Sequence, residues 1–247
     1  MNVQRLLSKL RKGVATYKMI NDGDKVGVGV SGGKDSLALL ELLSQYRLFS
    51  PEKFDLCALS VDLCFDGIPT DYTEIEAYCK RLNVPFHVVR TEIGQIVFDA
   101  RKEKSPCALC SKMRKGALYE LATSIGCNKI ALGHHADDLI DTFMLSLLYE
   151  GRLSTFAPKS YLDRTGLTLI RPMIYLEESW IKTLAPSLPV IQSRCPANDN
   201  TKREEIKTKI NAFGGDVKNV REMIFTALTH PERYNLFDKF IKEIEEF

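Results

Sequence analysis

One short segment, residues 25–36, limits the possible folds more than any other part of this 247-residue chain. Lys25–Val30 has the pattern of a buried strand and runs straight into the glycine-rich string Ser31-Gly32-Gly33-Lys34-Asp35-Ser36. Leu37–Tyr46 then has apolar residues at helical spacing. A loop between a buried strand and the start of a helix presents free backbone N–H groups and the positive end of the helix dipole. The segment therefore predicts an anion site.

Each residue type in this loop suits phosphate binding. Gly32 and Gly33 allow a positive φ and let phosphate oxygens approach the backbone. Ser31 and Ser36 add hydroxyl donors, and Lys34 adds a positive charge. A glycine pair alone fits a plain helix-entry turn equally well, but the whole string between a strand and a helix is far more specific. The string lacks the spacer and the Gly-Lys-Ser/Thr ending of the Walker loop, so chemistry at the γ-phosphate is not indicated.

Strands and helices alternate along the chain, and this order predicts an α/β fold. Strands separated by helices of this length form a parallel sheet covered on both faces, so we expect a doubly wound parallel sheet. Helical N- and C-terminal additions are expected as well. The predicted strands are 25–30, 54–61, 86–91, 129–133 and 167–170, and the predicted helices are 1–12, 37–46, 71–82, 108–125, 136–149, 177–184, 201–213, 217–228 and 235–246.

We expect the chain, residues 1–247, to form a single domain, because no internal repeat or low-complexity linker divides it. The N-terminal helix occupies 1–22 in this division, the α/β core 23–190, and a loop with a helical section 191–247. The segment 191–200 contains a proline and several polar residues and is predicted to be a loop.

Composition points to a cytoplasmic protein. No run of 18 apolar residues is present, and the first 12 residues lack the apolar core of a signal peptide. Seven cysteines, an odd number without a secretion signal, argue against a disulfide framework. The net charge of +2 gives no global nucleic-acid signal, so any RNA contact must come from a local patch.

A second polar cluster, residues 133–138, follows the fourth predicted strand and opens a helix with the sequence Gly-His-His-Ala-Asp-Asp. Ligands gather at the C-terminal ends of parallel strands. Paired carboxylates there suit a magnesium contact, and an imidazole can touch a phosphate or a nucleobase. A helix capped by aspartate, with solvated histidines, is the alternative.

Cys107 and Cys110 differ from the other cysteines because they lie three residues apart at a predicted helix start. This spacing puts both sulfurs on one helix face, and the nearby positive charges favour the thiolate. The pair suits a redox dithiol, half a zinc site or two ligands of an iron–sulfur cluster. By contrast, Cys57, Cys79 and Cys127 are expected to be small buried hydrophobic residues.

Basic residues surround this cysteine pair and predict a patch that attracts RNA phosphate. A solvated helix face is the alternative. The residues are Arg101, Lys102, Lys104, Lys112, Arg114 and Lys115.

Several motifs together resemble the tRNA 2-thiocytidine synthetase family of N-type ATP pyrophosphatases, which have a PP-loop fold similar to that of adenine nucleotide alpha hydrolases. The resemblance rests on the loop Ser31–Ser36, the run Cys107–Tyr119, the run Lys129–Asp138 and the string Ile170-Arg-Pro-Met173. It continues in the same order to Asn235–Asp238 and so covers nearly the whole chain.

This resemblance implies an ATP-dependent tRNA sulfurtransferase. Such an enzyme adenylates the C2 oxygen of an anticodon-loop cytidine and replaces it with sulfur, which gives 2-thiocytidine. The resemblance implies ATP and Mg²⁺ at the loop, with catalytic roles for Lys34 and Asp35. We assign Gly133, His134 and Asp62 to the ATP site as well, and Asp138 together with Asp35 to the magnesium ion. The resemblance also implies a [4Fe–4S] cluster held by three cysteines, of which Cys107 and Cys110 match the first two. Cys195 falls in the segment that supplies the third, where the family often has a second Cys-x-x-Cys and this chain has Asn198.

Two other functions remain open from the sequence. A different PP-loop enzyme could thiolate another base or a small molecule, or could form lysidine or an amide, but it would have no use for three convergent cysteines. A nucleotide-binding protein could instead hold a structural zinc ion on the same cysteines. The implied partners are tRNA, ATP and a sulfur donor, either a cysteine desulfurase or sulfide, with no membrane partner. The sequence leaves open whether the chain forms a homodimer.

Overall fold

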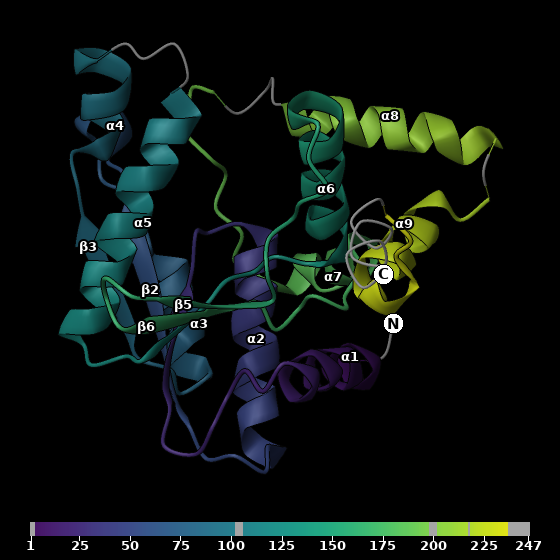
Figure 1. Ribbon diagram of the computed structural model, residues 1–247. Helices are drawn as coiled ribbons and strands as arrows, with labels where there is room; N and C mark the ends of the chain where they lie inside the picture. The colour runs from purple at the N-terminus through teal and green to yellow at the C-terminus, as the bar shows by residue number, and fades with distance from the viewer. Residues whose placement is uncertain (1–2, 102–105, 198–201, 217, 237–247) are drawn as a thin grey trace. The chain divides into compact units, whose positions relative to one another are not determined.

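The computed structural model describes residues 3–101, 106–197, 202–216 and 218–236 (Figure 1). The predicted helix 235–246 lies mostly outside these residues, as do Lys102, Lys104 and Asn198. In chain order the elements are α1 Val3–Thr16, β1 Lys25–Gly29, α2 Lys34–Phe49, β2 Asp55–Asp62, η1 Phe65–Gly67, α3 Thr73–Arg81, β3 Phe86–Arg90, α4 Ile93–Gln95, η2 Ile96–Ala100, α5 Pro106–Ser124, β4 Lys129–Ala131, α6 Ala136–Glu150, β5 Lys159–Leu162, β6 Leu167–Ile170, α7 Glu178–Lys182, η3 Ala185–Ser187, α8 Lys202–Asp216, α9 Val220–Thr229 and η4 Pro231–Arg233.

The chain groups into two compact units. The first comprises residues 1–136 and 156–201, and the second comprises residues 137–155 together with the chain from 202 onward. The division into a helix, a core and a helical section within one domain stays a prediction. No helix in the described part of the chain is long and apolar enough to cross a membrane.

The first unit is built on a six-stranded sheet with the order β3-β2-β1-β4-β6-β5. All neighbouring strands pair in parallel except β5, which runs antiparallel to β6 at the edge. The doubly wound α/β prediction is confirmed, and the antiparallel edge strand is an addition to it. The sequence did not reveal β5 because Lys159–Leu162 alternates exposed and half-buried residues, without the apolar run of a central strand.

The strand order reverses direction at β1. The chain leaves β1 for β2 and β3 on one side, and it returns to β4 and β6 on the other side. A crevice forms where the connections after two neighbouring parallel strands turn to opposite sides, and ligands of open α/β sheets bind there. The loop after β1 therefore occupies the ligand-binding edge of the sheet.

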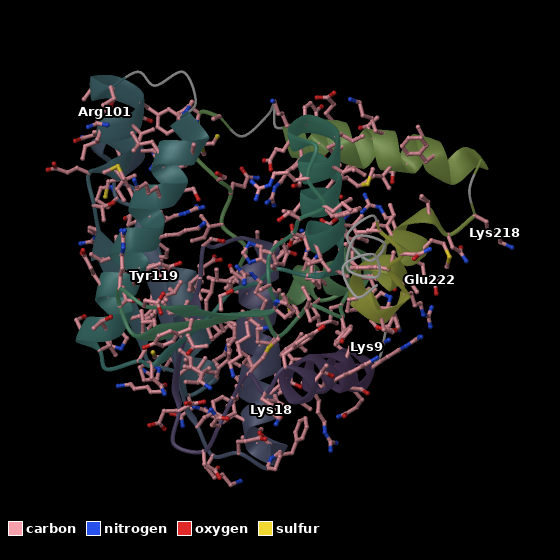
Figure 2. The ribbon with its side chains drawn as sticks, in the orientation of Figure 1. Lys9, Lys18, Arg101, Tyr119, Lys218 and Glu222 are labelled. Carbon is pink, nitrogen blue, oxygen red and sulfur yellow. The ribbon has the colours of Figure 1, made fainter. Side chains whose placement is uncertain are left out.

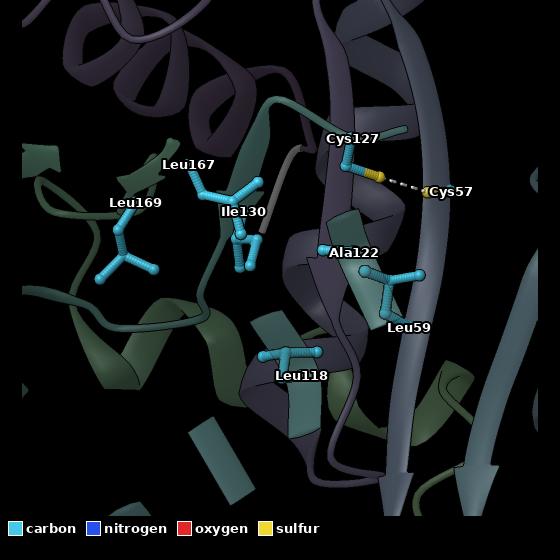
Figure 3. Packing of buried hydrophobic residues seen from close by; sticks show 8 residues of the cluster. All are labelled: Cys57, Leu59, Leu118, Ala122, Cys127, Ile130, Leu167 and Leu169. Atoms are coloured by element: carbon cyan, nitrogen blue, oxygen red, sulfur yellow. Dashed lines mark hydrogen bonds between the residues drawn. The ribbon is translucent and has the colours of Figure 1, made fainter. Parts of the chain in front are cut away.

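The α5 helix packs on the face of the sheet that the glycines of β1 leave clear. The buried cluster in Figure 3 joins Leu118 and Ala122 of α5 to side chains of β2, β4 and β6. A Cβ atom added at Gly27 would lie 2.5 Å from Leu59 Cδ1 and 3.2 Å from Cys127 Sγ. Close packing in this layer therefore requires the absence of a side chain at Gly27.

The cysteines predicted to be hydrophobic core residues are all buried, which confirms that prediction. Cys57 and Cys127 share a thiol hydrogen bond with their sulfurs 3.4 Å apart, as the dashed line in Figure 3 marks. Cys79 is buried on α3. Burial raises the pKa of the Cys79 thiol to about 11, so it stays protonated and behaves as an apolar residue.

The second unit has a small core of its own. Ile140 and Met144 of α6 pack against Ile206 and Ile210 of α8, with side chains of α9 around them. Arg221 of α9 joins this core to the acidic face of α6 through ion pairs with Asp137 at 3.1 Å and Asp141 at 3.3 Å.

The packing at β1 gives a stability prediction. Gly27→Val should lower the free energy of unfolding by about 1–3 kcal/mol, because the added methyl groups have no space beside Leu59 and Cys127. Gly116→Ala is the matched control, since a Cβ there meets nothing within 4 Å and alanine favours the helix by about 1 kcal/mol. Urea unfolding measures both. Equal stability of Gly27→Val and the wild type would contradict the packing described here.

Candidate nucleotide and cysteine site

The glycine-rich loop connects β1 to the first turn of α2. Gly32 has a φ of +84°, a left-handed conformation that glycine adopts without strain. The Ser36 hydroxyl donates to the Gly33 carbonyl at 2.8 Å and accepts from the Ser31 N–H at 3.1 Å, which fixes the curve of the loop. Gly33 is the N-cap of α2, and no described side chain caps this end of the helix. The first turn of α2 therefore keeps its N–H groups available for an anion.

Gly133, at the end of β4, lies directly against this turn. A Cβ atom at Gly133 would lie 2.9 Å from the backbone carbon and oxygen of Asp35 and 3.1 Å from the Ser36 nitrogen. Only a glycine lets the two backbones approach so closely. The structure therefore brings Gly133 together with the loop residues, as the predicted ATP site requires.

Two carboxylates flank the Lys34 ammonium group. Its Nζ lies 2.9 Å from Glu178 Oε1 of α7 and 3.0 Å from Asp35 Oδ2. Burial alone would lower the pKa of Lys34, but the hydrogen bonds and charges of Glu178 and Asp35 outweigh it and raise the pKa. The lysine is thus held as a cation beside the loop, in position to neutralise phosphate charge.

The predicted magnesium ligands belong to different units. Asp35 lies in the first unit, with Oδ1 3.8 Å from Nε2 of the buried His135. Asp138 lies in the second unit, where its Oδ1 is 3.5 Å from Arg203 Nη1. A shared magnesium ion at Asp35 and Asp138 stays a prediction.

Asp62, at the end of β2, is buried and holds the following turn. Its carboxylate accepts hydrogen bonds from the Cys64 N–H at 3.1 Å and from the Thr70 N–H and hydroxyl at 2.9 Å each. This network fixes the segment beside the phosphate loop. A direct contact of Asp62 with ATP stays a prediction.

An aromatic and cationic group lies at the ends of β4 and β6. The ring of His134 lies 5.0 Å from that of Phe156, and the Arg171 guanidinium lies over the same phenyl ring at 4.8 Å. Arg171 is buried, donates to the Ala157 carbonyl and has no carboxylate partner among the described residues. The half-buried rings of His134 and Phe156 offer a stacking surface of the kind that holds unpaired RNA bases.

Cys110 lies on the inner side of α5 in an apolar cluster with Leu63, Ile93 and Val97. Ile93 and Val97 of this cluster come from α4 and η2, two short helices beside α5 that the sequence did not predict (Figure 1). Burial raises the pKa of the Cys110 thiol, Arg114 opposes this change, and the charges of Cys195 and Cys107 add to it. Cys107 itself is exposed at the start of the helix.

The third predicted cysteine comes from a segment attached to the phosphate loop. The Ile191 N–H donates to the Gly32 carbonyl at 2.9 Å, and Cys195 follows four residues later with its N–H on Ser193 Oγ at 3.2 Å. The charges of Cys195 and Cys107 both act on the Cys110 thiol. Within the described residues, however, no group of three His, Cys, Asp or Glu side chains is arranged so that it could hold a metal ion. The three cysteines match a thiolate-ligated centre in the kind of donor that they offer.

Comparison with known proteins identifies the family. A family model described as a PP-loop domain matches residues 2–190. The tRNA-cytidine(32) 2-sulfurtransferase of Syntrophotalea carbinolica is 35% identical over 248 residues, which cover 97% of this chain and 95% of the relative. The chain belongs to this family of PP-loop proteins. A second member, from Pelobacter propionicus, is 36% identical over 241 residues and covers 96% of this chain and 89% of its own.

Among solved structures, the U34-tRNA thiolase NcsA from Methanococcus maripaludis, described with its [4Fe–4S] cluster, has a similar fold. It superposes with a TM-score of 0.73 at 22% identity, covering 94% of this chain and 80% of that chain. The predicted PP-loop sulfurtransferase family, its fold and its class of enzyme are therefore confirmed.

Sequence reasoning missed several residues that the structure brings to the candidate site. Glu178 gave no signal, because 144 positions separate it from its partner Lys34 and only the fold of α7 onto α2 joins them. Arg171 stood in a quoted motif without a role, and Phe156 stood in none. Arg171 comes close to His134 because β4 pairs with β6, and Phe156 does so because β5, which follows it, pairs with β6.

The contact at Gly133 gives a binding prediction. Gly133→Ala should push the first turn of α2 away from β4 and weaken ATP binding about tenfold or more, the size expected when a tight contact loses 1–3 kcal/mol. Isothermal titration calorimetry with ATP measures the change. Gly116→Ala, in open space on α5, is the control and should keep wild-type affinity. Unchanged affinity in Gly133→Ala would show that this backbone contact does not shape the ATP site.

Proposed function

We propose that this chain converts cytidine 32 of tRNA to 2-thiocytidine, using ATP to activate the base. Membership of the tRNA-cytidine(32) 2-sulfurtransferase family supports ATP-dependent tRNA thiolation. We also propose that the reaction takes place in the cytoplasm. The sulfur donor is proposed to be a cysteine desulfurase or sulfide.

The first step needs an electrophilic activation, because the C2 oxygen of cytosine is a poor leaving group. The C2 oxygen attacks the α-phosphorus of ATP, the bond to the β-phosphate oxygen breaks, and pyrophosphate leaves. The α2 N-terminus and Lys34 are placed to stabilise the negative charge that develops on the phosphates. Asp35, on the same turn, supplies a carboxylate for the Mg²⁺ that accompanies ATP.

The second step replaces AMP with sulfur. A sulfur nucleophile attacks C2, the C2–O bond breaks, and AMP leaves with both electrons of that bond. Cys107, Cys110 and Cys195 would hold a [4Fe–4S] cluster, with Arg114 near Cys110 to offset its negative charge. When bound by three thiolates, such a cluster leaves one iron without a protein ligand and able to bind a sulfur species.

One observation carries this proposal in preference to a structural zinc protein or a different adenylating enzyme. The segment that bears Cys195 begins with a hydrogen bond from Ile191 to Gly32 of the phosphate loop. The charge of Cys195, on the same segment, contributes to the raised pKa of the Cys110 thiol. A zinc ion used only for stability would have no need to be connected to the nucleotide loop, whereas sulfur transfer to an adenylated base requires that proximity.

Asp35→Asn tests the adenylation step. We expect pyrophosphate release in the presence of tRNA to fall about 100-fold or more, because the loss of one charged group that stabilises a transition state costs this much. The fold should survive, since the side chain is isosteric and partly exposed. Asp55→Asn, at an exposed position at the start of β2, is the control. Wild-type turnover by Asp35→Asn would remove Asp35 from the mechanism.

Cys195→Ser tests the sulfur site. Anaerobically purified wild type should be brown with about four irons per chain, the number set by the cluster type. The variant should lose the iron and the 2-thiocytidine product while calorimetry still detects ATP binding. Cys79→Ala, in the buried core, is the control and should keep both. A variant that retains iron and product would place the third ligand elsewhere, and zinc in the wild type would favour the structural-metal alternative.

A further inference from the structure

The N-terminal helix carries a charge that the reaction chemistry does not use. The first 21 residues contain five lysines and arginines and no aspartate or glutamate, although the whole chain has a net charge of only +2. Arg5, Lys9 and Lys12 are spaced by four and three residues, so they share one face of α1. We call these three residues, with Trp180 and Tyr175 beneath them, the α1 basic face.

Aromatic rings, not carboxylates, support these cations. The Arg5 guanidinium lies 4.7 Å from the centre of the Trp180 ring and Lys9 Nζ lies 5.8 Å from it, while Lys12 Nζ lies 4.7 Å from the Tyr175 ring (Lys9 is labelled in Figure 2). None of the three makes an ion pair with another described residue. A ring contact orients a cation without neutralising it, so the charges remain available to an anionic partner.

The α1 basic face is held rigidly. Leu6 and Leu10, on the other side of the helix, are fully buried against the rest of the first unit. The Tyr17 and Tyr175 hydroxyls are 3.2 Å apart, and Gly13 lies so close to Pro172 that a Cβ there would be 2.8 Å from its carbonyl oxygen. A surface fixed in this way binds without first losing the conformational freedom of the helix.

The face also adjoins the phosphate loop. The short helix α7 connects the two, because Glu178 pairs with Lys34 and Trp180, two residues later, supports Arg5 and Lys9. A partner on the α1 basic face would therefore lie next to the ATP site. The apolar stripe of α1 is already buried in the protein, so the helix has no apolar face to insert into a membrane.

We propose that the α1 basic face binds the phosphate backbone of the tRNA substrate. Repeated cations that make no ion pair with a described carboxylate, interleaved with aromatic rings beside a nucleotide site, match the chemistry of RNA phosphates. This inference rests on the proposed function and adds to it a surface separate from the basic residues around Cys107 and Cys110.

The double variant Lys9→Glu/Lys12→Glu tests the proposal. Fluorescence anisotropy with labelled tRNA at several salt concentrations should show a Kd about tenfold or more above that of the wild type. The slope of log K against log salt should fall by about two, one for each lysine. ATP affinity should not change. Lys53→Glu/Lys80→Glu makes the same change of charge at exposed positions without side-chain partners and should keep wild-type affinity.

The outcomes separate this inference from the proposed function. An unchanged Kd and slope in Lys9→Glu/Lys12→Glu would overturn the proposal that the α1 basic face binds tRNA, and so would an equal loss of affinity in the control pair. In either case, formation of 2-thiocytidine by the wild type would still support the proposed function. Failure of the wild type to bind tRNA would overturn both. If charge reversal unfolds the helix, Lys9→Gln/Lys12→Gln decides, with the same expected fall in slope. Binding of the wild type to phosphatidylglycerol vesicles, with tRNA affinity unaffected by the variants, would assign the face to a membrane and refute the proposal.

Discussion

The contact between Gly133 and the first turn of α2 is the constraint on which the nucleotide site depends. It fixes the end of β4 against the phosphate loop at a separation that no side chain would permit. The parallel pairing of β1 with β4 creates this contact, since it brings both carboxyl ends to one edge of the sheet. The next two residues are histidines: His134 lies against the ring of Phe156, and His135 lies beside Asp35.

Charge in the first unit is arranged in two ways. Lys34 is clamped between Glu178 and Asp35, which keeps it charged at a fixed point in the loop. Arg171 and the cations of α1 are instead placed over aromatic rings and have no acidic partner among the described residues. The first arrangement suits a group that acts at one position in a reaction. The second leaves positive potential available for an anion that arrives from outside.

Connection of the cysteine segment to the phosphate loop explains how one chain can combine two chemistries. Ile191 is bonded to Gly32, so the position of Cys195 depends on the same loop that is proposed to bind ATP. Cys107 and Cys110, by contrast, lie on α5, the helix that packs on the sheet.

The sequence by itself determined the local parts of this protein. The strand–loop–helix string 25–36, the cysteine pair at the start of α5 and the alternation of strands with helices are encoded within short windows, where spacing and residue type are sufficient. Only the tertiary structure decided three other features: the antiparallel strand β5, the packing of α4 and η2 beside Cys110, and the partners of Lys34 and Arg171. These features depend on residues far apart in the chain, and their geometry is set by how strands pair and helices pack, which no local pattern records.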